Sequence, residues 1–122
     1  MREIRLRYDF KLISKDNSKA FNPITHRCYL DPKYKAFEDR VRWETKAQYH
    51  GKPLEGNLVC EITACFEDNR RCDVGNLSKS LLDALQGLLY ENDKQIVKLT
   101  VSIGIVDKAY FVITLLSTLT GR

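Results

Sequence analysis

The chain lacks several features that define broad protein classes. It has no apolar run approaching the ~20 residues that cross a bilayer, and its first residues, Met-Arg-Glu-Ile-Arg-Leu-Arg, lack the apolar centre of a secretory signal. It has three prolines and six glycines in 122 residues, and we find no internal repeat, linker or low-complexity block. These absences argue against a membrane-spanning or secreted protein, and we expect a cytoplasmic one.

Metal-binding cysteine patterns are also missing. No two of the four cysteines have the Cys-x-x-Cys spacing of a zinc site, and the two histidines form no ligand repeat with them. A cytoplasmic compartment keeps thiols reduced. The sequence therefore predicts free thiols at Cys28, Cys60, Cys65 and Cys72.

The overall amino-acid composition is typical of a single globular domain. The chain is 43% hydrophobic and 30% charged, which is ordinary for a soluble protein, and its length is sufficient for a single core. We expect one domain over residues 1–122. A net charge of +4 and a pI near 8.9 permit a polyanionic partner without requiring one.

Apolar periodicity predicts the order of the elements. Alternation predicts strands within residues 2–13, 58–66, 95–106 and 110–116. Helical stripes predict one helix that begins at Asp31-Pro32 and a second with Asn76 as its N-cap. Residues 14–29 are predicted to be a long polar loop. The order strand, helix, strand, helix, strand, strand predicts an α+β fold, with a small mixed β-sheet and two helices on one side.

The same patterns predict which faces are buried. The stripe of the first helix consists of Tyr34, Phe37 and Val41, extended by Ala47. The buried face of the third strand is expected to consist of Val97, Leu99, Val101, Ile103 and Ile105. After a tight turn at Asp107-Lys108, the last strand is expected to run back beside the third.

Two aspartates flank the second helix. Asp73 precedes it and Asp93 stands at the mouth of the next strand. They converge only if the chain brings both loops to one edge of the sheet. Carboxylates from separate segments, with water and a substrate phosphate, are the ligands that Mg²⁺ takes. A nearby lysine would steady the phosphate or the developing negative charge.

The run from Arg70 to Val97 contains an ordered set of polar residues. It reads Asp73-Val74-Gly75-Asn76-Leu77-Ser78-Lys79, then Asp83-Ala84-Leu85, then Asp93-Lys94-Gln95-Ile96. This set resembles the signature of RusA-type Holliday junction resolvases, Asp-x-Asp-Asn-Leu-x-Lys, Asp-Ala-Leu and Asp-x-Gln-Val/Ile. The resemblance implies a homodimeric endonuclease that resolves four-way DNA junctions by paired symmetric nicks in recombination and repair.

The resemblance also implies roles for individual residues. Asp73 and Asp93 would hold Mg²⁺, for which Mn²⁺ could substitute, and Lys79 would assist them in catalysis. The middle aspartate of the family falls on Gly75 here, so one ligand is absent. Asp68 and Glu91 are the nearest carboxylates that could replace it.

Basic residues in two segments are candidates for DNA contact. Residues 14–29 interleave basic and aromatic side chains, which suits phosphates and exposed bases, although an ordinary surface loop would look similar. A basic pair also opens the motif. The expected DNA-binding residues are Lys15, Lys19, Arg27, Arg70 and Arg71.

Other functions remain open at this stage. Singly, Asp73 suits a helix start, Asp93 suits a turn, and Lys79 can pair with Asp83. Because Gly75 removes a carboxylate, the chain could be a junction-binding or DNA-binding module with weak or no cleavage. It could also be an unrelated α+β protein that binds a small acidic ligand or a protein partner, which steeply salt-dependent binding to branched DNA would exclude.

Overall fold

The structure is a computed structural model, and it describes residues 2–13, 19–22, 27–30, 32–68 and 74–117. The elements in chain order are β1 (Arg2–Tyr8), β2 (Lys19–Asn22), β3 (Arg27–Leu30), α1 (Pro32–Gln48), β4 (Leu58–Phe66), α2 (Val74–Leu85), the short 3₁₀ helix η2 (Asp93–Gln95), β5 (Ile96–Ile105) and β6 (Tyr110–Ser117). For β2 and β3 only the backbone is described.

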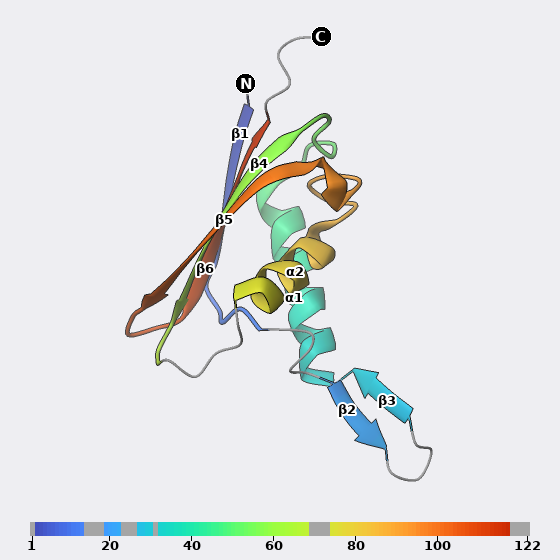
Figure 1. The fold of residues 1–122 in the computed structure, drawn as a ribbon, viewed down its shortest axis with the longest axis vertical. Coiled ribbons are helices and arrows are strands. Elements are labelled where there is room, and N and C mark those ends of the chain that lie inside the picture. Colours follow the sequence, from blue (N-terminus) through green and yellow to red (C-terminus); the bar gives the residue numbers. More distant parts are fainter. Residues whose placement is uncertain (1, 14–18, 23–26, 31, 69–73, 118–122) are drawn as a thin grey trace.

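A four-stranded mixed sheet forms the centre of the fold, with the strand order β1-β6-β4-β5. β6 runs antiparallel to both of its neighbours, whereas β4 and β5 are parallel. Parallel neighbours need a crossover connection, and α2 supplies it. Both helices lie on the same side of the sheet (Figure 1). The predicted α+β class and the order β-α-β-α-β-β are therefore confirmed.

The segment predicted to be a polar loop contains a β-hairpin instead. β2 and β3 pair antiparallel, with Lys19 opposite Leu30 and Asn22 opposite Arg27. In Figure 1 this hairpin extends beyond the N-terminal end of α1, away from the sheet. Each strand has only four residues, which is too short to give a readable alternation of apolar and polar residues.

An aromatic cluster joins β1 to α1 and β6. The ring of Tyr8 stacks on Phe111, with centroids 4.6 Å apart, and Phe10 meets both Phe37 and Phe111 edge to face. The Tyr8 hydroxyl also shares a hydrogen bond of 2.7 Å with the buried Thr45 hydroxyl. These contacts fix α1 against the sheet by its buried face.

The buried stripe of α1 follows the prediction at three positions and departs from it at the end. Tyr34, Phe37 and Val41 are buried as expected, but Thr45 takes the next position and Ala47 is exposed. A threonine can be buried here because its hydroxyl donates to the Val41 carbonyl, at 2.6 Å.

The outer face of α1 is charged and carries one large apolar side chain. Lys35 pairs with Asp39 at 3.0 Å and Arg40 pairs with Glu44 at 3.5 Å, as their helical spacing predicts. Trp43 lies on the same surface and is 73% exposed.

The predicted buried face of β5 is largely uncovered. Val97, Leu99 and Ile105 are 59%, 41% and 54% exposed, while Val101 and Ile103 are partly buried against the core. Alternation identifies an apolar face but not what covers it. Because β5 has only β4 as a neighbour in the described sheet, it is an edge strand, and the core covers this face only in part.

The predicted pairing of the last strand with β5 is wrong. β6 crosses to the other side of β4 and lies between β4 and β1. One face of β6 is fully buried and the other is buried or half-buried, with no exposed residue along the strand, which suits a central position in the sheet. The tight turn at Asp107-Lys108 favoured a hairpin of β5 and β6. The apolar side chains of β6 are instead buried by pairing with β1 and β4.

Helix α2 begins earlier than predicted. It starts at Val74, so Asn76 is its third residue and not its N-cap. Leu77, Leu81 and Leu85 are buried on one face of the helix, which ends at Leu85. Gly87 follows with a φ of 89°, a conformation that favours glycine.

Two further observations bear on the sequence predictions. Cys60 and Cys65 are buried, and both have free thiols, as predicted; the thiols of Cys28 and Cys72 lie outside the description. In the part of the chain that the structure describes, no helix has the length and apolarity to cross a membrane.

Candidate functional site

Asp93 is exposed at the first position of η2, directly before the edge strand β5. Asn92 caps this short helix, because its side-chain oxygen accepts a hydrogen bond of 2.9 Å from the Lys94 N–H. An open hollow of about 370 Å³ adjoins the turn and is lined by residues 52–56, Glu91 and Gln95. The carboxylate-bearing residue therefore lies at an accessible position on a defined turn.

The side chain of Gln95 holds this turn in place. Its Oε1 accepts hydrogen bonds from the backbone N–H groups of Glu91 and Asn92, at 3.0 and 3.1 Å. Its Nε2 donates to the carbonyls of Leu54 and Gly56, at 2.9 and 3.0 Å. One side chain thus connects the turn before Asp93 to the segment that precedes β4.

Tyr90 lies fully buried beside the same turn. Its hydroxyl donates to the Leu82 carbonyl in α2. Burial raises the pKa of Tyr90 above its ordinary value, and charge on Cys60, Asp93 and Asp83 raises it further. The phenol therefore stays neutral near pH 7. The hydrogen bond to the Leu82 carbonyl ties the segment that leads to η2 to the last turn of α2.

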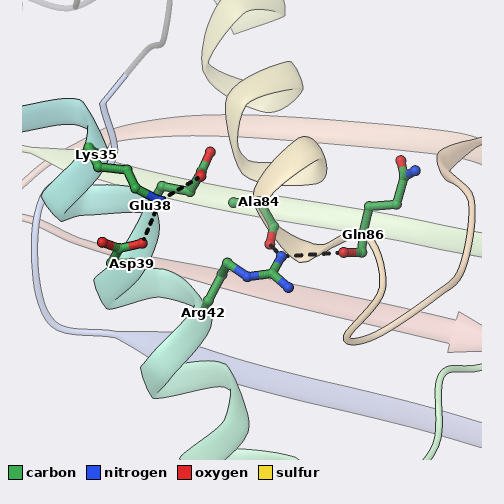
Figure 2. A network of polar contacts seen from close by, with 6 residues as sticks. All are labelled: Lys35, Glu38, Asp39, Arg42, Ala84 and Gln86. Carbon is green, nitrogen blue, oxygen red and sulfur yellow. Dashed lines mark hydrogen bonds and ion pairs between the residues drawn. The ribbon is translucent and has the colours of Figure 1, made fainter. Parts of the chain in front are cut away.

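Arg42 connects α1 to the C-terminal end of α2 (Figure 2). Its Nη1 donates to the carbonyls of Ala84 and Gln86, at 2.7 and 3.3 Å. A cation satisfies the free carbonyls at a helix C-terminus and suits the helix dipole. In the same view Lys35 pairs with Asp39 at 3.0 Å, a turn away along α1. Arg42 thereby fixes the end of α2 from which the chain leads to Asp93.

Lys79 and Asp93 belong to different parts of the site. Lys79 is exposed on the second turn of α2, and no ion pair joins it to Asp83 among the described contacts. The 12 residues of α2 span about 18 Å at ~1.5 Å per residue. Val74, which follows Asp73 in the chain, begins the helix, and Asp93 comes eight residues after Leu85, the last residue of the helix, at the first position of η2.

Several predicted site residues lie outside the described residues. They are Asp73, Lys15, Arg70 and Arg71. Lys19 is the first residue of β2 and Arg27 is the first residue of β3, and the structure describes only their backbone. The predicted meeting of Asp73 with Asp93 and the predicted DNA contacts therefore stay predictions.

The two carboxylates considered as replacements for the missing ligand are far apart along the fold. Asp68 is exposed just after β4 ends, and Glu91 is exposed two residues before Asp93. Gly75 itself is exposed in the first turn of α2. Among the residues that the structure describes, no three His, Cys, Asp or Glu side chains form a group that could hold a metal ion.

Sequence reasoning assigned no role to three residues that shape this region: Gln95, Tyr90 and Arg42. A signal for Gln95 was present, because Asn92 and Gln95 have the spacing of a capping box, in which the two side chains bond reciprocally to backbone N–H groups. No sequence pattern indicates the contacts of Arg42 and Tyr90, since both depend on tertiary packing.

Comparison with known proteins agrees with the motif. A family model described as "Endodeoxyribonuclease RusA" matches residues 9–115. A protein of Aquifex aeolicus (strain VF5), named "Crossover junction endodeoxyribonuclease RusA", is 28% identical over 86 residues, which cover 70% of this chain and 68% of that protein. The match to the family model begins directly after β1 and ends within β6, so it includes both helices, β4, β5 and the Asp93 turn. The resemblance found in the sequence is confirmed, and the chain belongs to the RusA family of endodeoxyribonucleases.

Proposed function

We propose that this protein is a magnesium-dependent, structure-selective endonuclease that resolves four-way (Holliday) DNA junctions by paired symmetric nicks. The observation that carries the proposal is an exposed aspartate on a turn that Gln95 holds with four hydrogen bonds, in a chain of the RusA family. The Aquifex relative is named for crossover junctions, and a four-way junction is such a structure.

The donor chemistry of the site suits a magnesium ion. Mg²⁺ takes one or two carboxylates and keeps several waters, so it does not need a cage of protein ligands. Asp93 is exposed and held by the Gln95 turn, and Asp73 would be the second ligand. When bound, the ion would activate a water and stabilise charge on the scissile phosphate. Manganese, with similar oxygen ligands, would substitute.

The residues of the chain would then divide the work of binding and catalysis. Gln95 orients Asp93 through the turn that it holds. The Lys79 ammonium, exposed on α2, would neutralise negative charge that develops on the phosphate. The basic residues before α2 and in the hairpin segment would contact the DNA backbone, where cations release bound counterions. These residues are Arg70, Arg71, Lys15, Lys19 and Arg27.

A homodimer fits both the substrate and the geometry. A two-fold symmetric enzyme matches a junction with two equivalent points of cleavage. Val74 begins α2, and Asp93 follows the other end of that helix in the chain, so a dimer also allows Asp73 of one protomer to share a metal with Asp93 of its partner.

Cleavage of a synthetic four-way junction tests the proposal. Wild type should cut with Mg²⁺ and not with EDTA. Asp93→Asn should bind the junction but cut it at least about a hundredfold more slowly, which is the effect of losing one electrostatic group in an active site. Asp39→Asn is the matched control, because it removes an exposed aspartate on α1 and should cut like wild type. Unchanged cleavage by Asp93→Asn would reject the proposed role.

A second candidate is a junction-binding protein that does not cut. Gly75 motivates it, because a carboxylate is missing from the motif while the segment stays basic. If wild type shifts the junction on a gel but does not cut it with Mg²⁺ or Mn²⁺, this candidate replaces the first. Cleavage by Gly75→Asp in that case would identify the missing ligand as the cause.

A further inference from the structure

A second open hollow, of about 300 Å³, lies between the C-terminal end of α1 and the turn that follows α2. We call it the α1 hollow. Its volume is at the lower end of the usual range for ligand sites, about 300–1,000 Å³. These residues have no part in the proposed metal site. The side chains and backbone that line the hollow include those of Thr45, Lys46, Tyr49, His50, Pro53 and Leu88.

The α1 hollow is built on the same framework as the Asp93 turn. Pro53 lines both this hollow and the one beside that turn. The next residue, Leu54, donates its N–H to the Leu89 carbonyl at 2.8 Å, and its own carbonyl accepts from Gln95 Nε2 at 2.9 Å. A molecule in the α1 hollow would therefore lie beside the segment that is bonded to the turn carrying Asp93.

The charges around the α1 hollow favour an anion. Lys46 and His50 line it, and no described residue of its lining carries a carboxylate. Among the described residues, no carboxylate pairs with Lys46. A further cation is close, because the guanidinium carbon of Arg2 lies 5.6 Å from the centre of the Tyr49 ring. A wall with cations and without carboxylates attracts a phosphate.

The lining of the α1 hollow also includes an aromatic ring that is held in place. The Tyr49 hydroxyl donates to the Lys52 carbonyl. Gly51 makes room for this ring, because a Cβ at that position would come 2.6 Å from the Tyr49 hydroxyl oxygen. Pro53 and Leu88 add apolar surface. A flat ring with little freedom suits a nucleobase, since bases stack on aromatic side chains and a preorganised site loses less entropy on binding.

A nucleotide combines the two features that this hollow suits, a flat base and a phosphate. Inside a continuous duplex a base must be unstacked and unpaired before it can enter a pocket, and the cost is lowest where the base is already poorly stacked or paired. At the branch point of a four-way junction the arms separate, so the bases there lack a continuous stack. Junction DNA therefore supplies the nucleotides that enter such a hollow most easily.

We propose that the α1 hollow binds one unstacked nucleotide of the junction, next to the phosphodiester that is cut, with its base against Tyr49 and Pro53 and a phosphate near Lys46. The inference rests on the proposed function, because it takes junction DNA as the ligand. It adds a subsite that positions the strand relative to Asp93 without any contact to the metal.

A double-mutant cycle between protein and DNA tests the subsite. The affinity of the full chain for a synthetic four-way junction is measured in EDTA by fluorescence anisotropy of the labelled DNA. An abasic site replaces each nucleotide near the branch point in turn. The intact-to-abasic affinity ratio of wild type should exceed that of Tyr49→Ala about tenfold at one position, and the ratios should agree elsewhere. The comparison cancels the cost of unstacking, which is the same for both proteins.

Two other substitutions of Tyr49 control for effects on the fold. Tyr49→Phe keeps the ring and should keep the wild-type ratio at the sensitive position. Tyr49 packs against the core, so Tyr49→Leu, which keeps an apolar side chain there, takes the place of Tyr49→Ala if that variant does not fold. A purely structural role of Tyr49 would lower the affinity for intact and abasic junctions equally.

The phosphate contact is tested by the salt dependence of binding. Lys46→Ala should lower the slope of log affinity against log salt concentration by about one, as expected for the loss of one phosphate contact. Lys108→Ala is the matched control, because it removes an exposed lysine in the turn between β5 and β6, and its slope should equal that of wild type.

The outcomes separate this proposal from the proposed function. Coupling at one position, with the lower slope for Lys46→Ala, supports the subsite even if the junction is not cut with Mg²⁺, in which case only the nuclease proposal fails. Equal ratios for wild type and Tyr49→Ala at every position, or equal slopes for Lys46→Ala and Lys108→Ala, overturn the subsite, and cleavage with Mg²⁺ would then still support the nuclease. If the junction is cut, a coupled position away from the cut bond also overturns the subsite.

Discussion

Gln95 offers a direct test of how the turn before β5 is held. Gln95→Ala removes all four hydrogen bonds of this side chain, two accepted from the Glu91 and Asn92 N–H groups and two donated to the carbonyls of Leu54 and Gly56. The backbone of the turn then loses its connection to the segment before β4. The fold should survive, because no core side chain is touched.

The magnitude follows from the exposure of these bonds. A hydrogen bond contributes about 0.5–1.5 kcal/mol net to stability. Three of the four have exposed partners, where water can replace the side chain, and only the bond to Leu54 is part-buried. Three bonds at the low end and one near the middle of that range give a loss of about 2–3 kcal/mol in the free energy of unfolding.

Urea unfolding followed by far-ultraviolet circular dichroism measures this loss. Gln86→Ala is the matched control, because the exposed Gln86 side chain takes no part in the four hydrogen bonds made by Gln95, and it should cost less than about 0.5 kcal/mol. If Gln95→Ala costs no more than the control, the reasoning about the turn is refuted. In the folded variant, the Mg²⁺ concentration for half-maximal junction cleavage should rise, because Asp93 is no longer held.

Three other predictions concern stability. Arg42→Ala removes both hydrogen bonds to the C-terminal end of α2 and should lower the free energy of unfolding by about 1–2 kcal/mol, with Arg42→Lys recovering part of it; equal losses in urea would contradict this. Burial raises the pKa of Tyr8 from its ordinary 10.0 to about 12, so its stabilisation is complete below pH 10 and is lost as the pH rises toward 12. Tyr8→Phe should make that alkaline loss shallower by up to about 1.4 kcal/mol per pH unit, and an unchanged slope in thermal melts would count against it. Gly87→Ala should cost about 1–2 kcal/mol through its positive φ, although nothing lies within 4 Å of the added methyl; a neutral effect in urea would show that the backbone adapts.

The sequence was sufficient to predict the elements whose bounds depend only on their own pattern of apolar and polar residues. β4 runs from Leu58 to Phe66 as predicted, because apolar residues alternate along its whole length. It pairs with a strand on each side, β6 and β5. The ordered motif from Asp73 to Ile96 was sufficient to identify the family. Local pattern and family signature are both readable from the chain without knowing what packs against it.

The errors share a different cause. The apolar face of β5 was predicted to be buried, and β6 was predicted to pair with β5, because both predictions used only neighbouring residues. Burial depends on what the rest of the chain brings to a face, and β6 moves to the centre of the sheet because both of its faces are apolar. The contacts of Arg42 and Tyr90 are likewise tertiary and leave no periodic signal.

The position of the single tryptophan affects how this protein can be studied. Trp43 is 73% exposed on the outer face of α1, so its indole is already surrounded by water in the native state. Its fluorescence should change little when the chain unfolds and would be a poor probe of denaturation. The same property makes it a convenient intrinsic reporter of any molecule that comes to rest on that helix, since quenching or a blue shift would arise from contact rather than from folding.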